Sequence, residues 1–258
     1  MGIIEKMRLD NKVSYVTGGA KGIGKSVAIA FAQAGACVAI VDIDIEEAKK
    51  TAQMLNDDYN SDSIAIKADV TNENDVDNMI NTIIDKYGKL DIAFNNAGIC
   101  INEAAEDMSY SKWKKVIDIN LSGIFLTSKA AGNVMIKQGG GSIINTASMS
   151  AHIVNVPQPQ CAYNASKAGV IQLSKSLAIE WSKHKVRVNT ISPGYMATEL
   201  IKNSTQLKPL IEEWNNMAPM KRMGNPEELQ SICVYLAGDT SSFTTGSDII
   251  VDGAFTCF

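Results

Sequence analysis

Residues 13–24, VSYVTGGAKGIG, decide the fold, because a short β-branched run enters a glycine-rich turn and a segment with helical spacing follows. Glycine lets the backbone turn sharply and lets a phosphate approach the main chain closely. The N–H groups and the dipole at a helix start favour negative charge. A glycine-rich turn alone is weak evidence, since any tight turn uses glycine. In this strand–turn–helix context the stretch predicts a pyrophosphate site, with contacts from Gly18, Lys21, Gly22, Ile23 and Gly24.

The same alternation of elements continues to the end of the chain. Short apolar runs, typical of buried parallel strands, alternate with longer segments of helical spacing. The expected strands are 13–17, 37–41, 64–68, 92–95, 142–146, 187–191 and 248–251, and the clearest helices are 25–34, 46–55, 73–87 and 162–183. This order predicts an α/β fold: a doubly wound parallel sheet (Rossmann fold) of about seven strands with helices on both faces, in a single domain over residues 1–258.

One segment, roughly residues 195–223, interrupts this rhythm after the sixth expected strand. It is polar and contains Pro209 and Pro219. Ligands of such sheets bind beyond the carboxyl ends of the strands, so we expect the segment to be a lid over a small-molecule substrate. The alternative is a surface excursion without function.

The bulk composition argues against several other classes. The net charge of −4 gives no reason to expect nucleic acid or an anionic membrane as a partner. The five cysteines are scattered and form no CxxC pair, which favours reduced thiols over a disulfide framework. The two histidines lie in no ligand cluster, so we expect no metal. Without a signal-peptide core or a bilayer-long apolar run, we expect a cytoplasmic protein.

Asp42, at the end of the second expected strand, bears on the choice of dinucleotide. An acid about 20 residues past the glycines can accept hydrogen bonds from the adenosine ribose hydroxyls and would repel a 2′-phosphate. Asp42 therefore favours NAD as the cofactor. Lys21 opposes this, because a cation beside the glycine turn could meet that phosphate, and NADP is the less favoured alternative. Asp42 could also be only a helix N-cap or a turn acid.

Two further strand ends carry candidate cofactor contacts. Asp69 and Val70 close the third expected strand, where they can meet the adenine, and a cap for the next helix is compatible with the same residues. The fourth strand ends in the stretch NNAG, residues 95–98. Two interpretations stay open for Asn96, Ala97 and Gly98, namely contact with the cofactor and a structural role that steadies the central strands.

Tyr163 and Lys167 lie four residues apart in an expected helix, so they share one helix face. An ammonium beside a phenol, whose usual pKa is ~10, favours the phenolate. Such a phenol can exchange a proton with an alcohol or a carbonyl group near neutral pH. The spacing alone occurs by chance in many helices, so the pair needs support from its surroundings.

Two other polar residues provide that support. Ser148 follows the expected strand 142–146, where its hydroxyl can donate to a substrate oxygen, and Ser150 is a nearby competitor for this role. Asn120 falls in an expected helix, where asparagine is not favoured by propensity. Its buried amide needs partners, and it can hold a water or a backbone carbonyl.

Together these residues resemble the signature of the short-chain dehydrogenase/reductase family. The shared features are the TGxxxGxG loop (Thr17, Gly18, Gly22, Gly24), NNAG at 95–98, Asn120, Ser148, Tyr163, Lys167, Pro193-Gly194 and Val251-Asp252-Gly253. They occur in order from about Leu9 to Phe258, and as a set they are highly specific. The resemblance implies an oxidoreductase that moves a hydride between NAD(P)(H) and a secondary alcohol or ketone.

The resemblance also implies a role for each catalytic residue. Tyr163 would be the general acid/base, and Lys167 would lower its pKa and bind the nicotinamide ribose. Ser148, rather than Ser150, would orient and polarise the carbonyl group. Asn120 would hold a water that links Lys167 to solvent as a proton relay.

Other implied features concern the cofactor and the assembly. Thr198 would hold the nicotinamide carboxamide, and Asp42 matches the acid of NAD-using members. The stretch that follows the sixth strand would add cofactor contacts from Pro193, Gly194, Met196 and Thr198. The family further implies a homotetramer with the C-terminal segment near a subunit interface.

The loop between Ser148 and Tyr163 carries a finer resemblance, to the polyol/ketose branch that includes arabinitol 2-dehydrogenases, sorbose reductases and mannitol 2-dehydrogenases. It reads SMS at 148–150, IVN at 153–155, PQPQC at 157–161 and YN at 163–164. Its amides, together with His152, can hydrogen-bond a polyhydroxy substrate, unless they face solvent or a neighbouring subunit. The expected substrate contacts are Ser148, Ser150, Asn155, Gln160 and Tyr163.

Two alternatives to a polyol substrate stay open. The same chemistry could act on a hydroxysteroid, an acetoin-like or a 3-oxoacyl substrate, although a bulky apolar substrate would need an apolar loop and lid. A nucleotide-sensing protein without catalysis is the more remote alternative, because it would normally lack Tyr163 or Lys167.

Overall fold

The computed structural model describes residues 2–202 and 207–257 of the chain. Within these residues, seven parallel strands form one sheet in the order β3-β2-β1-β4-β5-β6-β7. The strands are β1 (Val13–Thr17), β2 (Cys37–Asp42), β3 (Ile64–Lys67), β4 (Ile92–Asn95), β5 (Gly141–Thr146), β6 (Val186–Pro193) and β7 (Asp248–Val251). All seven expected strands are present, and the predicted fold class is confirmed.

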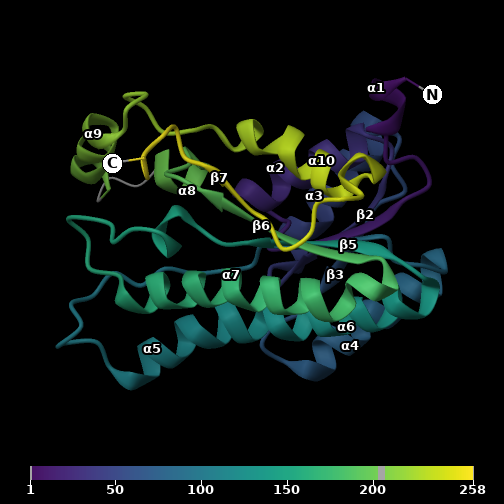
Figure 1. Cartoon of the computed structure of the whole chain (residues 1–258), viewed down its shortest axis with the longest axis horizontal. Helices are drawn as coiled ribbons and strands as arrows, with labels where there is room; N and C mark the ends of the chain where they lie inside the picture. The colour runs from purple at the N-terminus through teal and green to yellow at the C-terminus, as the bar shows by residue number, and fades with distance from the viewer. Residues whose placement is uncertain (1, 203–206, 258) are drawn as a thin grey trace.

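Helices cover both faces of this sheet (Figure 1). One face is covered by α2 (Gly22–Gln33), α3 (Ile45–Tyr59) and α10 (Gln230–Ala237), and the other by α4 (Glu73–Tyr87), α6 (Gly123–Gln138) and α7 (Cys161–Trp181). The remaining α-helices are α1 (Ile3–Lys6), α5 (Tyr110–Ile117), α8 (Glu199–Lys202) and α9 (Lys208–Met217). A π-helix, η1 (Asp118–Ser122), joins α5 to α6, and the 3-10 turns are η2 (Met149–Ala151), η3 (Ser182–His184), η4 (Pro226–Leu229) and η5 (Asp239–Ser241).

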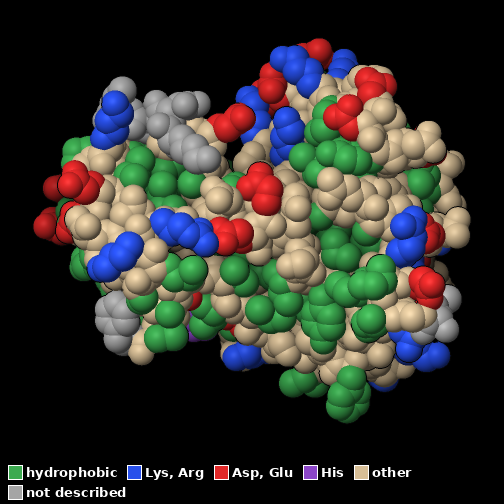
Figure 2. Space-filling model, turned by 90° about the horizontal axis from the view of Figure 1, so that it is seen from above, with side chains coloured by type: hydrophobic (Ala, Val, Ile, Leu, Met, Phe, Trp, Pro, Cys, Tyr) green, Lys and Arg blue, Asp and Glu red, His purple; other side chains and the backbone are tan. Residues whose placement is uncertain are grey.

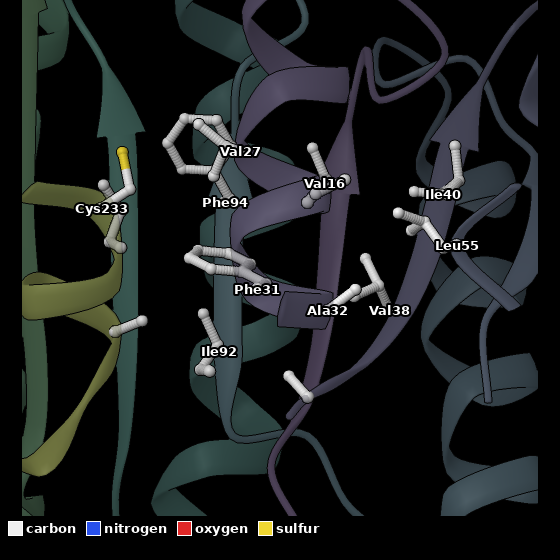
Figure 3. Packing of buried hydrophobic residues seen from close by; sticks show 14 of the residues in the cluster. Val16, Val27, Phe31, Ala32, Val38, Ile40, Leu55, Ile92, Phe94 and Cys233 are labelled. Atoms are coloured by element: carbon white, nitrogen blue, oxygen red, sulfur yellow. The ribbon is translucent and has the colours of Figure 1, made fainter. Parts of the chain in front are cut away.

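Apolar side chains fill the space on each side of the sheet. On the α2 side, Phe31 meets Phe94 of β4 edge to face, with 6.2 Å between the ring centroids. Val16, Ile40 and Leu55 belong to the same cluster (Figure 3). A second cluster lies between the sheet and α4, α6 and α7. Because both faces of the strands are covered, the strand sequences read as continuous apolar runs.

Local signals fix where the helices begin and end. α3 begins at the cap Asp44, whose side chain accepts a hydrogen bond from Glu47 N–H at 3.2 Å. It runs to Tyr59, past the expected end at Leu55, because Asn60 is the residue that takes the left-handed conformation, with φ 52°. None of the helices among the described residues has the length and apolarity that a membrane span requires.

The strand order places a ligand crevice at one end of the sheet. β1 and β4 are neighbours although they are not consecutive, and the chain winds outward from them in opposite directions. Ligands of such sheets bind at this reversal, beyond the carboxyl ends of the strands. The loops after β1, β4, β5 and β6 therefore converge there, and α8, α9 and the C-terminus lie at the same end (Figure 1).

Candidate active site

The glycine turn after β1 has the backbone shape and the space that a phosphate requires. Gly18 and Gly22 adopt positive φ angles of 61° and 59°, which L side chains rarely adopt. A Cβ on Gly24 would lie 2.1 Å from the Gly18 carbonyl oxygen, so the turn closes only around glycine. Because α2 begins at Gly22, its first N–H groups lie at this turn. The residues present therefore fit a dinucleotide pyrophosphate.

Asn96, after β4, braces the glycine turn. Its main-chain N–H donates to Thr17 Oγ1 at 2.9 Å, and its side-chain Nδ2 donates to the carbonyl oxygens of Thr17 and Gly18 at 3.2 and 3.3 Å. Ala97 N–H donates to the same Thr17 hydroxyl oxygen at 3.2 Å. A Cβ on Gly98 would lie 3.6 Å from Lys167 Nζ. Asn96 thus has a structural role, and cofactor contact by residues 96–98 stays a prediction.

Asn95 belongs to the core rather than to the crevice. Its side chain is fully buried, accepts from the Tyr15 hydroxyl at 2.8 Å and donates to Ser128 Oγ at 3.0 Å and Asn145 Oδ1 at 2.8 Å. These bonds tie β1, β4, β5 and α6 together. The interpretation that this stretch steadies the central strands is therefore confirmed for Asn95.

Asp42 faces the glycine turn from the end of β2. Its carboxylate accepts from Ala20 N–H at 3.2 Å and from Asp44 N–H at 3.1 Å. The cap of α3 is Asp44, so Asp42 is not the helix cap, while its bond to Asp44 N–H agrees with the alternative of a turn acid. The exposed Lys21 Nζ lies 3.6 Å from Asp44 and 3.8 Å from Glu47. Two carboxylates therefore lie within 4 Å of this ammonium at the expected adenosine end of the crevice.

Asp69 and Val70 lie at the same edge, after β3. Asp69 Oδ1 accepts from the N–H and the hydroxyl of Thr71 at 2.9 and 2.7 Å. Asn72, not Asp69, caps α4. Val70 is buried beside Gly123, where a Cβ would lie 2.8 Å from Val70 Cγ2. Contact with the adenine stays a prediction for both residues.

Tyr163 and Lys167 lie one turn apart on α7. Lys167 Nζ lies 5.6 Å from the centroid of the Tyr163 ring and donates to the Thr146 carbonyl oxygen at 2.7 Å. Lys167 is only 3% exposed, and burial lowers its pKa to about 8. Burial also raises the pKa of Tyr163, to about 12. The expected lowering of the Tyr163 pKa is therefore wrong for the chain by itself, because lost hydration disfavours the phenolate more than the nearby ammonium favours it.

Ser148 is the serine that meets Tyr163. The nearby Ser148 side chain lowers the pKa of the phenol and so partly offsets the effect of burial. Ser148 Oγ also accepts from Ser150 N–H and donates to Ser150 Oγ, each at 3.1 Å. Both serines are buried, and Ser150 supports Ser148 through these two bonds. The geometry thus brings Ser148, Tyr163 and Lys167 together, while their roles in catalysis stay predictions.

Asn120 lies in a helix as expected, and this helix, η1, is of the π type. Its side chain accepts from Ile99 N–H at 2.8 Å and donates to Ile99 O at 2.9 Å and to Ser166 Oγ at 3.1 Å. The Ser166 hydroxyl donates in turn to the Tyr163 carbonyl oxygen at 2.7 Å. The expected backbone partner is therefore present and connects Asn120 to α7. A water-holding role in a proton relay stays a prediction.

The amides between Ser148 and Tyr163 are buried and bond to one another. Asn155 and Gln160 are 4% and 7% exposed, which contradicts the alternative that they face solvent. Gln160 Nε2 lies 3.2 Å from Ser150 Oγ, 3.0 Å from Asn155 Oδ1 and 2.8 Å from Asn164 Oδ1. His152 instead points to β7, where Nε2 lies 2.7 Å from Asp248 Oδ2. Substrate contact by Asn155 and Gln160 stays a prediction.

The residues after β6 bend back over the glycine turn. Gly194 packs so closely against Asp252 that a Cβ on Gly194 would lie 2.8 Å from Asp252 Cα. Met196 is buried and forms an isolated parallel β-bridge with Gly224. A Cβ on Gly22 would lie 3.5 Å from Thr198 Cγ2. This places Thr198 beside the glycine turn, and its contact with the cofactor stays a prediction. Residues 203–206 of the expected lid lie outside the described residues.

Sequence reasoning missed an aromatic group that contacts the loop between Ser148 and Tyr163. Tyr195 stacks on Trp214 of α9 with 4.1 Å between the ring centroids, and Phe255 meets its edge at 5.5 Å. The Tyr195 hydroxyl accepts from Asn155 Nδ2 at 3.0 Å and from Gln158 Nε2 at 2.7 Å. An aromatic residue directly after Pro193-Gly194 was the available signal, but its partners lie far away in sequence.

The volume of the cavities does not by itself identify the candidate active site. A cavity of about 840 Å³ lies at the amino ends of the strands, beside Lys12, Asp91, Ser142 and Arg187, far from the converging loops. A smaller one, of about 120 Å³, lies beside Tyr195 and Trp214. Figure 2, which views the molecule from above the orientation of Figure 1, shows Lys and Arg side chains interspersed with Asp and Glu side chains. Among the described residues, no three His, Cys, Asp or Glu side chains cluster as metal ligands would.

Comparisons with known proteins agree with this geometry. A family model described as "Enoyl-(Acyl carrier protein) reductase" matches residues 18–256. A probable NADP-dependent mannitol dehydrogenase of Yarrowia lipolytica is 45% identical, over 99% of this chain and 91% of that protein. A sorbose reductase of Candida albicans is 41% identical, over 99% and 90%. The crystal structure of a short-chain type dehydrogenase/reductase from Mycobacterium marinum matches all of both chains with a TM-score of 0.96 and 40% identity.

The chain therefore belongs to the short-chain dehydrogenase/reductase family and is an oxidoreductase. This confirms the family resemblance of the sequence motifs. It also makes the converging loops after β1, β4, β5 and β6 the candidate active site.

Proposed function

We propose that the protein is an NAD(H)-dependent oxidoreductase that interconverts a polyol and its ketose. The observation that carries the proposal is the close grouping of Ser148, Tyr163 and Lys167 beside a wall of buried amides. The names of the Yarrowia and Candida relatives, mannitol dehydrogenase and sorbose reductase, support a polyhydroxy substrate. Pairs such as arabinitol and ribulose, or sorbitol and sorbose, fit this class.

In this proposal the turn of residues 18–24 holds the pyrophosphate and Asp42 the adenosine ribose. Lys167 donates one N–H to Thr146 and keeps the other two for the nicotinamide ribose. A bound nicotinamide supplies or accepts the hydride, and its positive charge in the oxidised form favours the Tyr163 phenolate.

The protein's own residues then handle the proton and the substrate oxygen. Ser148 donates a hydrogen bond to that oxygen and fixes its position beside the phenol. In oxidation, Tyr163 takes the hydroxyl proton as hydride leaves the same carbon. In reduction, the Tyr163 hydroxyl gives its proton to the carbonyl oxygen as hydride reaches the carbon. Residues 195–223 act as the lid that keeps water from this step.

We infer that NAD is preferred over NADP, although the Yarrowia relative is named NADP-dependent. Asp42 lies at the glycine turn, and Lys21, the cation in that turn, is already close to the carboxylates of Asp44 and Glu47. A 2′-phosphate placed beside these carboxylates would meet like charge, which is costly. The acidic balance at the adenosine end therefore supports NAD.

Asp42→Ala is expected to shift the ratio of kcat/KM for NAD over NADP toward NADP by about tenfold, because it removes a ribose acceptor and a repelling charge. Steady-state kinetics with both dinucleotides measure this ratio. Asp58→Ala removes an exposed carboxylate at the other end of α3 and is the matched control, with an unchanged ratio expected. An unchanged ratio in Asp42→Ala as well would remove Asp42 from cofactor selection.

A substrate panel followed by NADH absorbance tests the proposed function. It contains arabinitol, mannitol, sorbitol and galactitol, with a hydroxysteroid, an acetoin and a 3-oxoacyl thioester as competitors. We expect the highest kcat/KM with a polyol or its ketose. Turnover confined to the steroid, acetoin or acyl substrates would contradict the polyol assignment, and binding of NADH without any turnover would favour a sensing protein.

A further inference from the structure

We propose that the Tyr195 hydroxyl is a specificity-determining group, which donates a hydrogen bond to a second hydroxyl of the substrate. The inference rests on the proposed polyol/ketose function. It names the residue that would recognise a hydroxyl group on a carbon other than the reacting one. It follows from how the hydrogens around this phenol are distributed.

Trp214 determines which atoms donate and which accept in the hydrogen bonds to Tyr195. An indole N–H can only donate, and Trp214 Nε1 donates to Gln158 Oε1 at 3.2 Å. The Gln158 amide must therefore turn its Nε2 toward Tyr195, which it reaches at 2.7 Å. Asn155 also donates to Tyr195. Its Oδ1 accepts from Gln160, and its Nδ2 lies 3.0 Å from the Tyr195 oxygen.

The Tyr195 oxygen thus accepts two amide N–H bonds, one for each of its lone pairs. Burial raises the pKa of Tyr195, so the phenol keeps its proton near neutral pH. Among residues 2–202 and 207–257, no acceptor lies within hydrogen-bond distance of that proton. A partly buried O–H donor is therefore left over, and a ligand hydroxyl oxygen would satisfy it.

The place of this donor is beside the reaction centre. A hydrogen-bonded series runs from Tyr195 through Asn155, Gln160 and Ser150 to Ser148, which meets Tyr163. Cys100 Sγ lies 3.8 Å from Gln160 Oε1, in the middle of that series. The buried amides therefore connect the Tyr195 hydroxyl to the Ser148 hydroxyl.

The donor is also held in place before a ligand arrives. The ring of Tyr195 lies nearly parallel to Trp214, at 9°, and meets Phe255 at 83°, and both of these partners are buried. Two amides fix the hydroxyl at the other end of the ring. Little conformational freedom remains to be lost, so the bond would contribute most of its energy to recognition.

Tyr195→Phe tests the inference with two ketones of equal carbon length, erythrulose and butan-2-one, which differ in their hydroxyls. We expect kcat/KM for erythrulose to fall about tenfold, mainly through a higher KM, while the value for butan-2-one changes by less than about twofold. Quenching of Trp214 fluorescence by erythrulose should shift to higher concentration in the same variant. Equal losses on both ketones, or no loss on either, would overturn the inference.

A second variant removes the donor without removing the ring or its hydroxyl. In Gln158→Glu the carboxylate can only accept, so it still takes the Trp214 N–H and now also takes the Tyr195 proton. We expect the same selective loss on erythrulose. Full retention of the preference for erythrulose over butan-2-one in Gln158→Glu would also overturn the inference.

The control is Tyr235→Phe, which removes a hydroxyl bonded to Thr244 at 2.8 Å on α10, and the ratio of the two ketones should stay that of the wild type. Assays of the wild-type protein distinguish failure of the proposed function from failure of this inference. If the wild type reduces butan-2-one but no ketose, the proposed function fails. If the wild type reduces erythrulose and the Tyr195 and Gln158 variants keep its preference for erythrulose over butan-2-one, the inference alone fails.

Discussion

Tyr163→Phe is expected to lower kcat/KM by a factor of about 10² to 10⁴, since it removes the hydroxyl that we propose as the general acid/base. The ring remains beside Lys167, 5.6 Å from the ammonium in the wild type, so packing of the helix face is retained. Dinucleotide affinity should be unchanged, because the phosphate turn and Asp42 lie on other elements. Absorbance assays of turnover and a fluorescence titration with NADH measure the two quantities separately.

The control is Tyr110→Phe, a change at an exposed tyrosine at the start of α5. It should leave both turnover and NADH binding at wild-type values. Tyr163→Phe with wild-type turnover would show that another group carries the proton, and loss of NADH binding would show that the substitution disturbs the cofactor site.

Gly24→Ala is expected to weaken dinucleotide binding by about tenfold to a hundredfold and to lower the free energy of unfolding by about 1–3 kcal/mol. The added Cβ would lie 2.1 Å from the Gly18 carbonyl oxygen and 2.8 Å from Asn96 Nδ2. Because the first of these atoms is backbone, the glycine turn itself must move. NADH titration and denaturant unfolding measure the two effects.

Gly139→Ala is the matched control for backbone strain without a collision. Gly139 has a φ of 90° at the end of α6, and a Cβ there would meet nothing within 4 Å. We expect a loss of stability of about 1–2 kcal/mol from the left-handed conformation and unchanged NADH affinity. If Gly24→Ala bound NADH as tightly as Gly139→Ala, the phosphate would not sit in this turn.

The sequence was sufficient for the features that depend on local pattern. The glycine turn, the buried strands and the helix pair Tyr163–Lys167 each follow from residue types at fixed short spacing. The structure placed Ser148, rather than Ser150, against the phenol, as the family resemblance implied. The strand bounds differ by two residues at most from those expected, because apolar runs end where the chain leaves the sheet.

Other features depend on partners far away in the sequence, and local pattern could not predict them. The amides of Asn155 and Gln158 lie about 40 residues from Tyr195, and the bonds between them exist only after α9 and the loop pack together. The sign of the Tyr163 pKa shift was wrong because burial of the phenol is a tertiary property. Likewise, the π-helix at Asn120 changes the backbone hydrogen bonds, and the spacing of apolar residues in the sequence does not reveal this change.

Deuterium labelling of NADH is the most direct test of hydride transfer in this crevice. The protein is incubated with a ketose and with NADH that carries deuterium at the transferring position of the nicotinamide ring, and the polyol is analysed by mass spectrometry and NMR. Direct transfer predicts one deuterium at the new carbinol carbon for each NADH consumed. A polyol whose carbinol hydrogen came from solvent, or NADH left unconsumed with every ketose of the panel, would contradict it.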